Sequence, residues 1–245
     1  IIIVGNKELL NGQLKKLGYS IKMNDMNNIK LSKLKKINIK NIKFKYKKLF
    51  SNITKLSNDY LKESFYEALK ITKINPKNFI FLNGPVSKKT FFNKKYLGVT
   101  EYLSKKTDSK NEVMLIYNEK LSVSPITTHI PLKNVAKKIN KQKIINNLLK
   151  LNNFYKNIIK KKPKFAILGL NPHCETVDIV SEEEKIIIPS IKSLKKKKVD
   201  ISGPFSADTF FLKKNIDKYD VVVGMYHDQV LTPIKTLYEY DAINI

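Results

Sequence analysis

The sequence has no arginine and no tryptophan, and the missing arginine limits what its positive charge can mean. All 47 basic residues are lysine, against 21 acidic residues, which gives a formal net charge of +26. Base readout in DNA and bidentate binding of phosphate both favour arginine. Lysine, asparagine and isoleucine are the residues of AT-rich codons, so mutational bias explains the composition. We interpret runs such as Lys160–Lys162 and Lys195–Lys198 as solvated surface, and expect weak, salt-sensitive binding to polyanions but no specific nucleic-acid partner.

Cysteine and long apolar runs are also scarce. The single cysteine, Cys174, excludes an internal disulfide and fits a reducing cytoplasm. The apolar runs are far shorter than the roughly 18–20 residues that cross a bilayer. The N-terminus IIIVGNKELL lacks the features of a secretory signal. We therefore expect a cytoplasmic protein with no membrane span. Because the chain starts without methionine and stops at DAINI, we expect a longer natural protein, truncated here at both ends.

Only eight glycines are present, and none of them forms G-x-G-x-x-G. This absence excludes the classical dinucleotide-binding fingerprint, so the sequence does not locate a cofactor site. The length of 245 residues and the hydrophobic content of 42% are enough for one large or two ordinary domains.

Apolar periodicity predicts strands that alternate with helices. In the first part of the chain we expect a strand at 1–5, a helix at 6–19, weak strands or loops at 30–50, a helix at 57–73 and a strand at 78–89. In the second part we expect two strands around a turn at 118–120, two helices within 132–159, a strand at 164–173, a helix at 181–194 bent at Pro189 and a last strand within 220–229. The alternation indicates an α/β fold with a largely parallel or mixed sheet, in which ligands bind beyond the carboxyl ends of the strands.

The three histidines, His129, His173 and His227, each follow an apolar strand-like run. If these strands share a sheet, all three imidazoles emerge near its carboxyl ends. Three neutral imidazoles leave coordination positions open, as in a catalytic metal site. Asp208 and Asp228 are available to orient them or to bind the metal. The alternative is three unrelated histidines with local hydrogen bonds, since their spacings match no local metal motif.

Six short motifs follow one another along the chain: GPVSK (84–88), GVTEY (98–102), TTHIPL (127–132), GLNPH (169–173), SGPFSADTFF (202–211) and MYHDQ (225–229). They occur in the order seen in the 4-hydroxythreonine-4-phosphate dehydrogenase family of the vitamin B6 pathway, and the resemblance spans essentially the whole chain. It implies a fold similar to that of isocitrate and isopropylmalate dehydrogenases, with two α/β domains flanking a cleft and a mixed sheet. The first domain would comprise 1–92 plus 230–245, and the second, with the dimer interface, 93–229.

The resemblance also implies the chemistry. The family binds a divalent metal (Zn, Mg or Co) at the positions of His129, His173 and His227, and His227 reaches the metal of the other subunit of a homodimer. NAD or NADP oxidises the secondary hydroxyl of 4-phosphohydroxy-L-threonine, and the β-keto acid loses carbon dioxide to give 3-amino-2-oxopropyl phosphate. A metal suits both steps because it stabilises developing negative charge. The expected catalytic residues are the three histidines with Asp208 and Asp228.

The resemblance further assigns substrate contacts to Thr100, Lys235 and Asn244. Lys235 alone would be interpreted as surface charge, but its spacing from MYHDQ matches the family. Val99 stands where the family has a substrate-binding histidine, so one polar contact is lost.

Two loop positions also depart from the family. The glycine-rich loop after NPH is replaced by CETVD, and the glycine after HDQ is Val230. Glycine permits positive φ and close backbone approach, so both changes bear on ligand positioning. Cys174 is either an incidental small residue or a soft metal ligand. Two alternatives therefore stay open: a related dehydrogenase acting on a four-carbon sugar-acid phosphate, and a non-catalytic basic remnant that binds polyanions.

Overall fold

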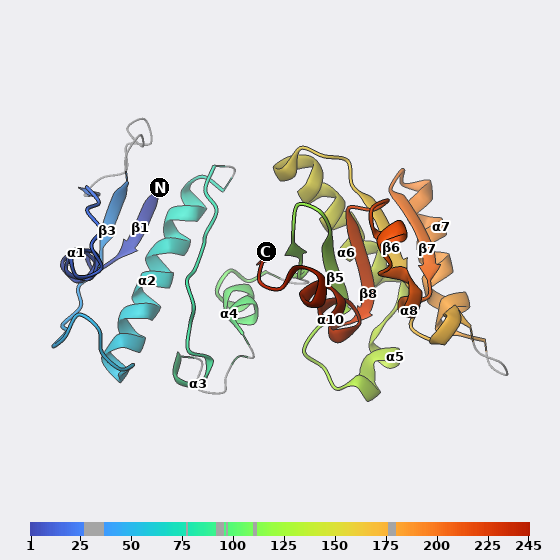
Figure 1. The fold of residues 1–245 in the computed structure, drawn as a ribbon, viewed down its shortest axis with the longest axis horizontal. Helices are drawn as coiled ribbons and strands as arrows, with labels where there is room; N and C mark the ends of the chain where they lie inside the picture. The colour runs from blue at the N-terminus through green and yellow to red at the C-terminus, as the bar shows by residue number, and fades with distance from the viewer. Residues whose placement is uncertain (27–36, 77, 92–95, 97, 110–111, 176–179) are drawn as a thin grey trace. The chain divides into compact units, whose positions relative to one another are not determined.

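The computed structural model describes residues 1–26, 37–76, 78–91, 96, 98–109, 112–175 and 180–245, and its fold is mixed α/β, as predicted (Figure 1). The chain divides into two compact units, Ile1–Leu103 and Ser104–Ile245. Within the described ranges, no helix is both long and apolar enough to cross a membrane. Part of the predicted segment 30–50, before Ile37, lies outside the described residues.

The first unit begins with the predicted strand and helix. Strand β1 (Ile2–Gly5) pairs in parallel with β3 (Asn38–Asn41), which pairs in parallel with β2 (Asn24–Asp25). Helix α1 (Lys7–Lys16) starts after Asn6, whose side-chain oxygen accepts a hydrogen bond from the backbone N–H of Leu9 at 2.8 Å. This bond satisfies one of the unpaired donors at the helix start.

Helix α2 (Lys55–Ile74) confirms the predicted helix and begins slightly earlier, at a capping box between Thr54 and Ser57. Its buried Phe65 packs with Phe91, at the end of α3 (Lys88–Phe91), and with Tyr102 of α4 (Val99–Lys106). The three rings contact one another edge-on or tilted, with centroids 5.3–5.7 Å apart. We call these three residues the aromatic cluster.

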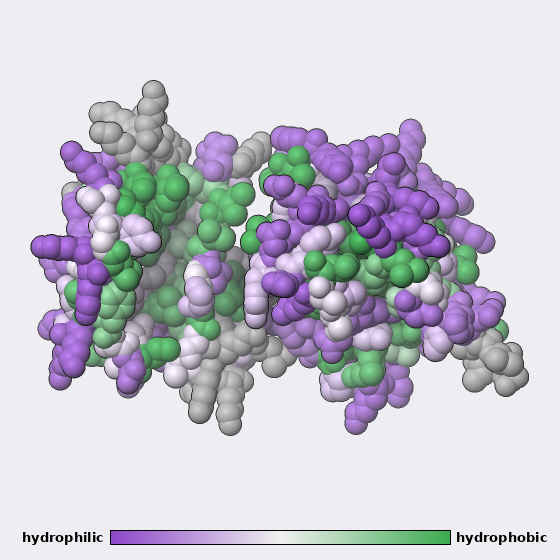
Figure 2. All heavy atoms as spheres, in the orientation of Figure 1, coloured by the Kyte–Doolittle hydropathy of each residue, from purple (hydrophilic) through white to green (hydrophobic). Residues whose placement is uncertain are grey.

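The predicted strand at 78–89 is wrong. Residues 78–87 form neither helix nor strand, and Ile80 and Leu82 are 80% and 86% exposed. A cavity of about 870 Å³ lies among β1, α2 and residues 78–86, and hydrophobic residues gather on this unit in Figure 2. The cavity separates the segment from β1, and a strand needs a hydrogen-bonded neighbour however high its β-propensity.

The second unit contains a six-stranded mixed sheet in the order β7-β6-β8-β5-β4-β9 (Figure 1). Its strands are β4 (Ile116–Tyr117), β5 (Ser122–Thr127), β6 (Lys164–Leu168), β7 (Asp200–Phe205), β8 (Val221–Tyr226) and β9 (Ile243–Asn244). The pairs β5–β8, β6–β8 and β6–β7 are parallel, whereas β4 is antiparallel to both β5 and β9. The predicted strands around 118–120 and within 220–229 are confirmed, and the strand predicted at 164–173 is present but ends at Leu168.

Both faces of this sheet are buried. Phe165 and Val221 point into one core with helices α6 (Lys141–Phe154) and α7 (Ile188–Lys196), while Ala166 and Val222 point into another with α10 (His227–Tyr238). Successive residues of a strand face opposite sides, so a strand buried on both faces has a continuous apolar sequence. This burial accounts for the three consecutive valines of β8. Short helices α5 (Val135–Lys138), α8 (Ala207–Phe210) and α9 (Lys213–Ile216) complete the unit.

Strand β7 was not predicted, because its sequence DISGPF contains Gly203 and Pro204. Proline donates no ladder hydrogen bond, but it is tolerated at the edge of a sheet, and β7 is an edge strand. The predicted bend at Pro189 takes the form of a π-helical turn (Glu183–Ile187) followed by α7. Pro189 lies in the first turn of α7, where a missing N–H is tolerated.

Residues 230–245 pack within the second unit in this chain. Val230, Leu231 and Ile234 of α10 are buried in its core, and β9 pairs with β4. In this chain, residues 230–245 thus contact the second unit, whereas we expected them to form one domain with residues 1–92. The domain boundaries of the whole protein stay a prediction.

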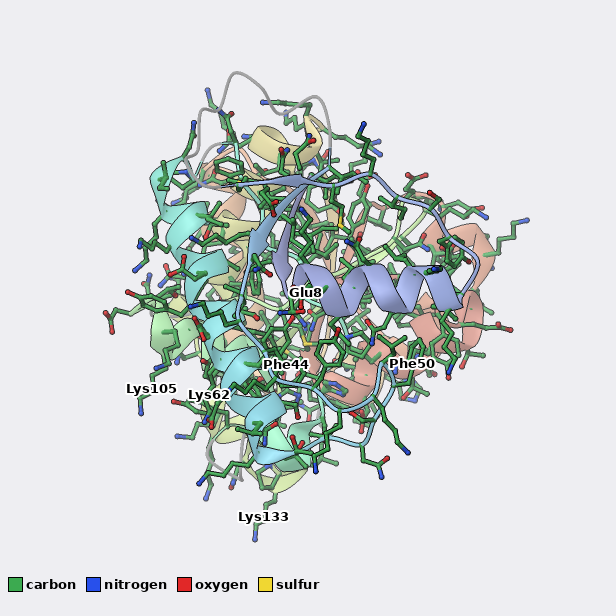
Figure 3. All side chains as sticks on the ribbon, turned by 90° about the vertical axis from the view of Figure 1, so that its left-hand side faces the viewer. Glu8, Phe44, Phe50, Lys62, Lys105 and Lys133 are labelled. Atoms are coloured by element: carbon green, nitrogen blue, oxygen red, sulfur yellow. The ribbon has the colours of Figure 1, made fainter. Side chains whose placement is uncertain are left out.

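Lysines lie on the surface, as expected. Lys160–Lys162 and Lys195–Lys198 are all exposed, and in Figure 3 the labelled Lys62, Lys105 and Lys133 point outward.

Candidate active site

The three histidines follow three adjacent parallel strands. Strands β6, β8 and β5 lie side by side, so their carboxyl ends meet at one edge of the sheet (Figure 1). His129 comes shortly after β5, His173 after β6, and His227 directly after β8. The three strands therefore share one sheet, which is the condition under which we expected the imidazoles to emerge together, and this is the edge at which α/β sheets bind ligands.

His129 and His227 lie close together, with ring centroids 5.7 Å apart and ring planes at 41°. Two imidazoles that bind one zinc ion through nitrogens at about 2.0–2.1 Å have ring centres roughly 5 Å apart at a tetrahedral angle. The strand ends that carry them are also joined, because the buried Thr127 hydroxyl donates to the Met225 carbonyl at 2.7 Å. The pair thus fits two of the three expected metal ligands.

Asp228 determines which nitrogen of His227 is available. Its Oδ1 lies 2.7 Å from Nδ1 of His227. An ionised carboxylate only accepts hydrogen bonds, so in the neutral ring this contact favours the tautomer with the proton on Nδ1 and the lone pair on Nε2. Metal-binding histidines in proteins commonly have this arrangement.

His173 lies in a short helical turn, Pro172–Cys174, with an unusual backbone. The φ angles of His173 and Cys174 are 56° and 66°, in the left-handed region, which costs about 1–2 kcal/mol for each such residue. Asp208 is in its vicinity. The hydrogen bond from the Ser206 hydroxyl, at 2.7 Å, is the main cause that lowers the pKa of Asp208, and the charge of His173 lowers it further.

His173 does not join the other two histidines in a single group. Among the residues that the structure describes, no three His, Cys, Asp or Glu side chains are grouped closely enough to hold a metal ion. One chain therefore brings together two of the expected ligands, His129 and His227, and presents the third at the same sheet edge. How the ligands are shared between subunits stays a prediction.

Glu183 was not singled out from the sequence, yet it contacts the segment that carries His173. The residue is 1% exposed, and its carboxylate accepts hydrogen bonds from the backbone N–H of Leu170 at 2.6 Å and of Asn171 at 2.9 Å. Burial opposes its ionisation, but these bonds and one from the Asn171 amide outweigh burial and lower the pKa of Glu183. In the sequence it is one of three successive glutamates, and no pattern distinguishes the buried one.

Gln229 is a second residue that we did not single out from the sequence, although it belongs to the MYHDQ motif. Its Oε1 accepts from the backbone N–H of Met225 at 2.7 Å, and its Nε2 donates to the carbonyl of Gly169 at 2.7 Å. One side-chain amide thus connects the carboxyl ends of β8 and β6.

A family model described as Pyridoxal phosphate biosynthetic protein PdxA matches residues 1–245. The chain belongs to this family. A 4-hydroxythreonine-4-phosphate dehydrogenase of Sulfurihydrogenibium sp. is 34% identical over 100% of this chain and 76% of its own length. A D-threonate 4-phosphate dehydrogenase of Pectobacterium atrosepticum is 37% identical over 61% of this chain and 46% of its own length.

Solved structures in the PdxA family share the fold. A 4-hydroxythreonine-4-phosphate dehydrogenase from Klebsiella pneumoniae superimposes with a TM-score of 0.76 at 24% identity, covering 99% of this chain and 77% of that protein. A 4-hydroxythreonine-4-phosphate dehydrogenase from Burkholderia phymatum superimposes with a TM-score of 0.73 at 24% identity, covering 96% of this chain and 73% of that protein.

The positions expected to bind the PdxA substrate are spread over both units. Lys235 lies on α10 and Asn244 on β9, and both are exposed in the second unit. Val99 and Thr100 begin α4 in the first unit, and both are partly buried. Val99, which replaces the family's histidine, packs against the aromatic cluster.

One of the departures from the PdxA pattern has a structural account. Val230 is fully buried in the first half of α10 and is not among the residues with positive φ, so no glycine is required there. Burial raises the pKa of the Cys174 thiol. The loop CETVD is described only as far as Glu175.

Proposed function

We propose that the protein is a 4-hydroxythreonine-4-phosphate dehydrogenase that uses a divalent metal (Zn, Mg or Co) and NAD or NADP. It would convert 4-phosphohydroxy-L-threonine to 3-amino-2-oxopropyl phosphate in pyridoxal 5'-phosphate biosynthesis. The observation that carries the proposal is the pair of His129 and His227 at the carboxyl edge of the sheet, with Asp228 on Nδ1 of His227. The membership of the PdxA family supports the choice of reaction.

In this proposal His129, His173 and His227 hold the metal. When bound, the metal stabilises the negative charge that develops on the substrate oxygen during oxidation and during decarboxylation. Asp228 keeps the Nδ1 proton of His227 in place, so that Nε2 stays available. Asp208, whose pKa is lowered, supplies a negative carboxylate in the vicinity of His173 and favours its correct orientation.

The remaining residues serve the substrate. The exposed ammonium group of Lys235 provides a cation for an anionic phosphorylated substrate, and Thr100 and Asn244 provide hydrogen bonds. The cofactor would take a hydride from the carbon that bears the secondary hydroxyl, while the hydroxyl would lose its proton to solvent. The resulting β-keto acid would then release carbon dioxide and take up a proton in its place. We further propose a cytoplasmic homodimer whose active site both subunits build.

An absorbance assay of the full-length protein tests this function. Formation of NADH or NADPH from 4-phosphohydroxy-L-threonine is expected with added divalent metal, together with stoichiometric metal in the purified protein. His173→Ala should abolish turnover, and activity retained by this variant would overturn the metal assignment. Absence of both bound metal and turnover would favour the non-catalytic remnant.

A second substrate is favoured by one observation. Val99 occupies a position where the family contacts the substrate through histidine, and a relative that is 37% identical acts on D-threonate 4-phosphate. That compound is a four-carbon sugar-acid phosphate with a hydroxyl in place of the amino group. Running both substrates in parallel separates the two activities, because kcat/KM reports discrimination between competing substrates.

A further inference from the structure

The segment that carries His173, residues 169–175, is hydrogen-bonded to three side chains that lie outside it, those of Glu182, Glu183 and Gln229. We call it the His173 loop. The carboxylate of Glu183 accepts three hydrogen bonds from the start of the His173 loop. The backbone N–H groups of Leu170 and Asn171 donate to its Oε1, and the Asn171 amide donates to its Oε2 at 2.9 Å. A buried carboxylate is tolerated only with such a set of donors, so Glu183 and the loop depend on each other.

Gln229 connects the His173 loop to the strand that ends at His227. Its amide donates to the Gly169 carbonyl and accepts from the Met225 backbone N–H, each at 2.7 Å. Strands β6 and β8 are paired directly as far as Ile167 and Val223, and this amide adds a side-chain bridge just beyond the last pair. It therefore holds the start of the His173 loop against the end of the strand that leads to His227.

The packing around Gly169 shows how closely the loop is enclosed. A Cβ atom at this position would lie 2.9 Å from Glu183 Oε1 and 2.7 Å from the Cys174 sulfur. The loop then passes through two consecutive non-glycine residues with positive φ, His173 and Cys174. Such backbone conformations persist only where the surroundings determine them, and they cluster at functional sites.

We propose that Glu183 and Gln229 are positioning residues, which fix the His173 loop so that the His173 imidazole is presented for metal binding. This proposal rests on the metal role proposed above for His173. Neither side chain is among the proposed metal ligands or substrate contacts; each acts through its hydrogen bonds to the loop.

The test compares Co²⁺ binding by full-length variants. Glu183→Gln keeps the side-chain shape but replaces one acceptor oxygen with an N–H donor, which the Asn171 donors cannot satisfy. We expect the Co²⁺ dissociation constant to rise by about tenfold or more, the range found when groups that orient metal ligands are removed. Amide hydrogen exchange at Leu170 and Asn171 should accelerate, while Phe165–Leu168 of β6 stay protected. Gln229→Met should raise the dissociation constant similarly and expose the Met225 amide.

Matched controls separate positioning from general effects of charge or polarity. Glu184→Gln makes the same change at an exposed neighbour, and Gln142→Met removes an exposed glutamine from α6; both should bind Co²⁺ like the parent. His173→Ala is measured alongside, and if it binds Co²⁺ normally, the metal role itself fails. If His173→Ala loses binding but Glu183→Gln and Gln229→Met do not, the positioning proposal alone is overturned.

Folding is monitored by circular dichroism and thermal melting. Should Glu183→Gln fail to fold, Gln229→Met carries the same comparison at the second contact. Failure of both variants to fold would also overturn the proposal, because the two residues would then maintain the sheet rather than the loop.

Discussion

The carboxylate of Asp228 lies 2.7 Å from Nδ1 of its neighbour His227, at the start of α10. Asp228→Asn keeps the shape of this contact but removes the charge that favours a proton on Nδ1. We expect metal affinity to fall by about 10- to 100-fold, with a parallel loss of kcat/KM. A competition titration with a zinc chelator measures the affinity, and Asp200→Asn, at an exposed position of β7, is the control. Unchanged affinity would show that Asp228 does not orient the ring.

The sharing of ligands between subunits can be tested by mixing inactive variants. One chain does not group His173 with His129 and His227, so we expect His173 and His227 of any one site to come from different subunits. Mixed and reassorted His173→Ala and His227→Ala subunits should then recover about a quarter of the parent activity, since half of the dimers carry one complete site.

The same experiment with His129→Ala and His227→Ala identifies which ligand crosses the interface. Recovery means that His227 reaches the partner's metal, as the family resemblance implies, and that His129 and His227 of one chain bind different ions. Recovery only in the first mixture means that this neighbouring pair binds one ion and that His173 comes from the partner. Recovery in neither mixture would place all three ligands within one subunit and contradict the shared site.

The pH dependence of stability should report on Glu183. Hydrogen bonds from Asn171 and Leu170 hold its pKa below the usual value despite burial. A carboxyl with a lowered pKa in the folded state stabilises the protein above its unfolded pKa of about 4.3, and this contribution is lost as the pH falls through the folded pKa. Urea unfolding from pH 7 to acid should show a shallower loss of stability for Glu183→Gln than for the parent. If the free energy of unfolding falls equally with decreasing pH in both proteins, Glu183 contributes nothing to acid unfolding.

Restoring the family's histidine at Val99 should have opposite effects on activity and stability. Val99→His supplies a polar group for the substrate, and one added hydrogen bond of about 1 kcal/mol corresponds to a roughly fivefold gain in kcat/KM. It also places a polar ring against the aromatic cluster, so the melting temperature should fall. Val99→Ala, which lacks the polar group, should lower stability without the gain. An unchanged kcat/KM for Val99→His would remove this position from the substrate contacts.

Restoring the family's glycine at Val230 should destabilise the protein without raising its activity. Val230 is fully buried in the core beneath α10, so Val230→Gly creates a cavity and adds the helix penalty of glycine. We expect the free energy of unfolding to fall by about 3 kcal/mol. The control Leu237→Gly, at an exposed position of the same helix, should cost only about 1 kcal/mol. Higher activity of Val230→Gly would show instead that the valine hinders the site.

The histidine edge could be predicted because β6 and β8 are buried on both faces and have apolar sequences that stop where polar residues begin. Strand β5 is equally buried, but its sequence SVSPIT includes Ser122, Ser124 and Thr127. Strand β7 could not be predicted, since Gly203 and Pro204 disfavour a strand in the sequence, and its position at the sheet edge, where proline is better tolerated, is a property of the whole sheet. The segment 78–89 shows the opposite error, in which high β-propensity finds no partner strand. Glu183 could not be predicted because its contacts with Leu170 and Asn171 depend on how the intervening chain folds back, which no sequence pattern reveals.

The order of strands in the second unit differs from their order along the chain. Strand β8 lies between β5 and β6 but is synthesised last of the three, so the two flanking strands have no common partner until Tyr226 has been made. Parallel pairing across such separations is slow, and unpaired strands are exposed to aggregation. During synthesis, β5 and β6 therefore stay exposed to other pairing partners until β8 has been made. The sheet edge that bears the three histidines is among the last parts of this unit to form on the ribosome.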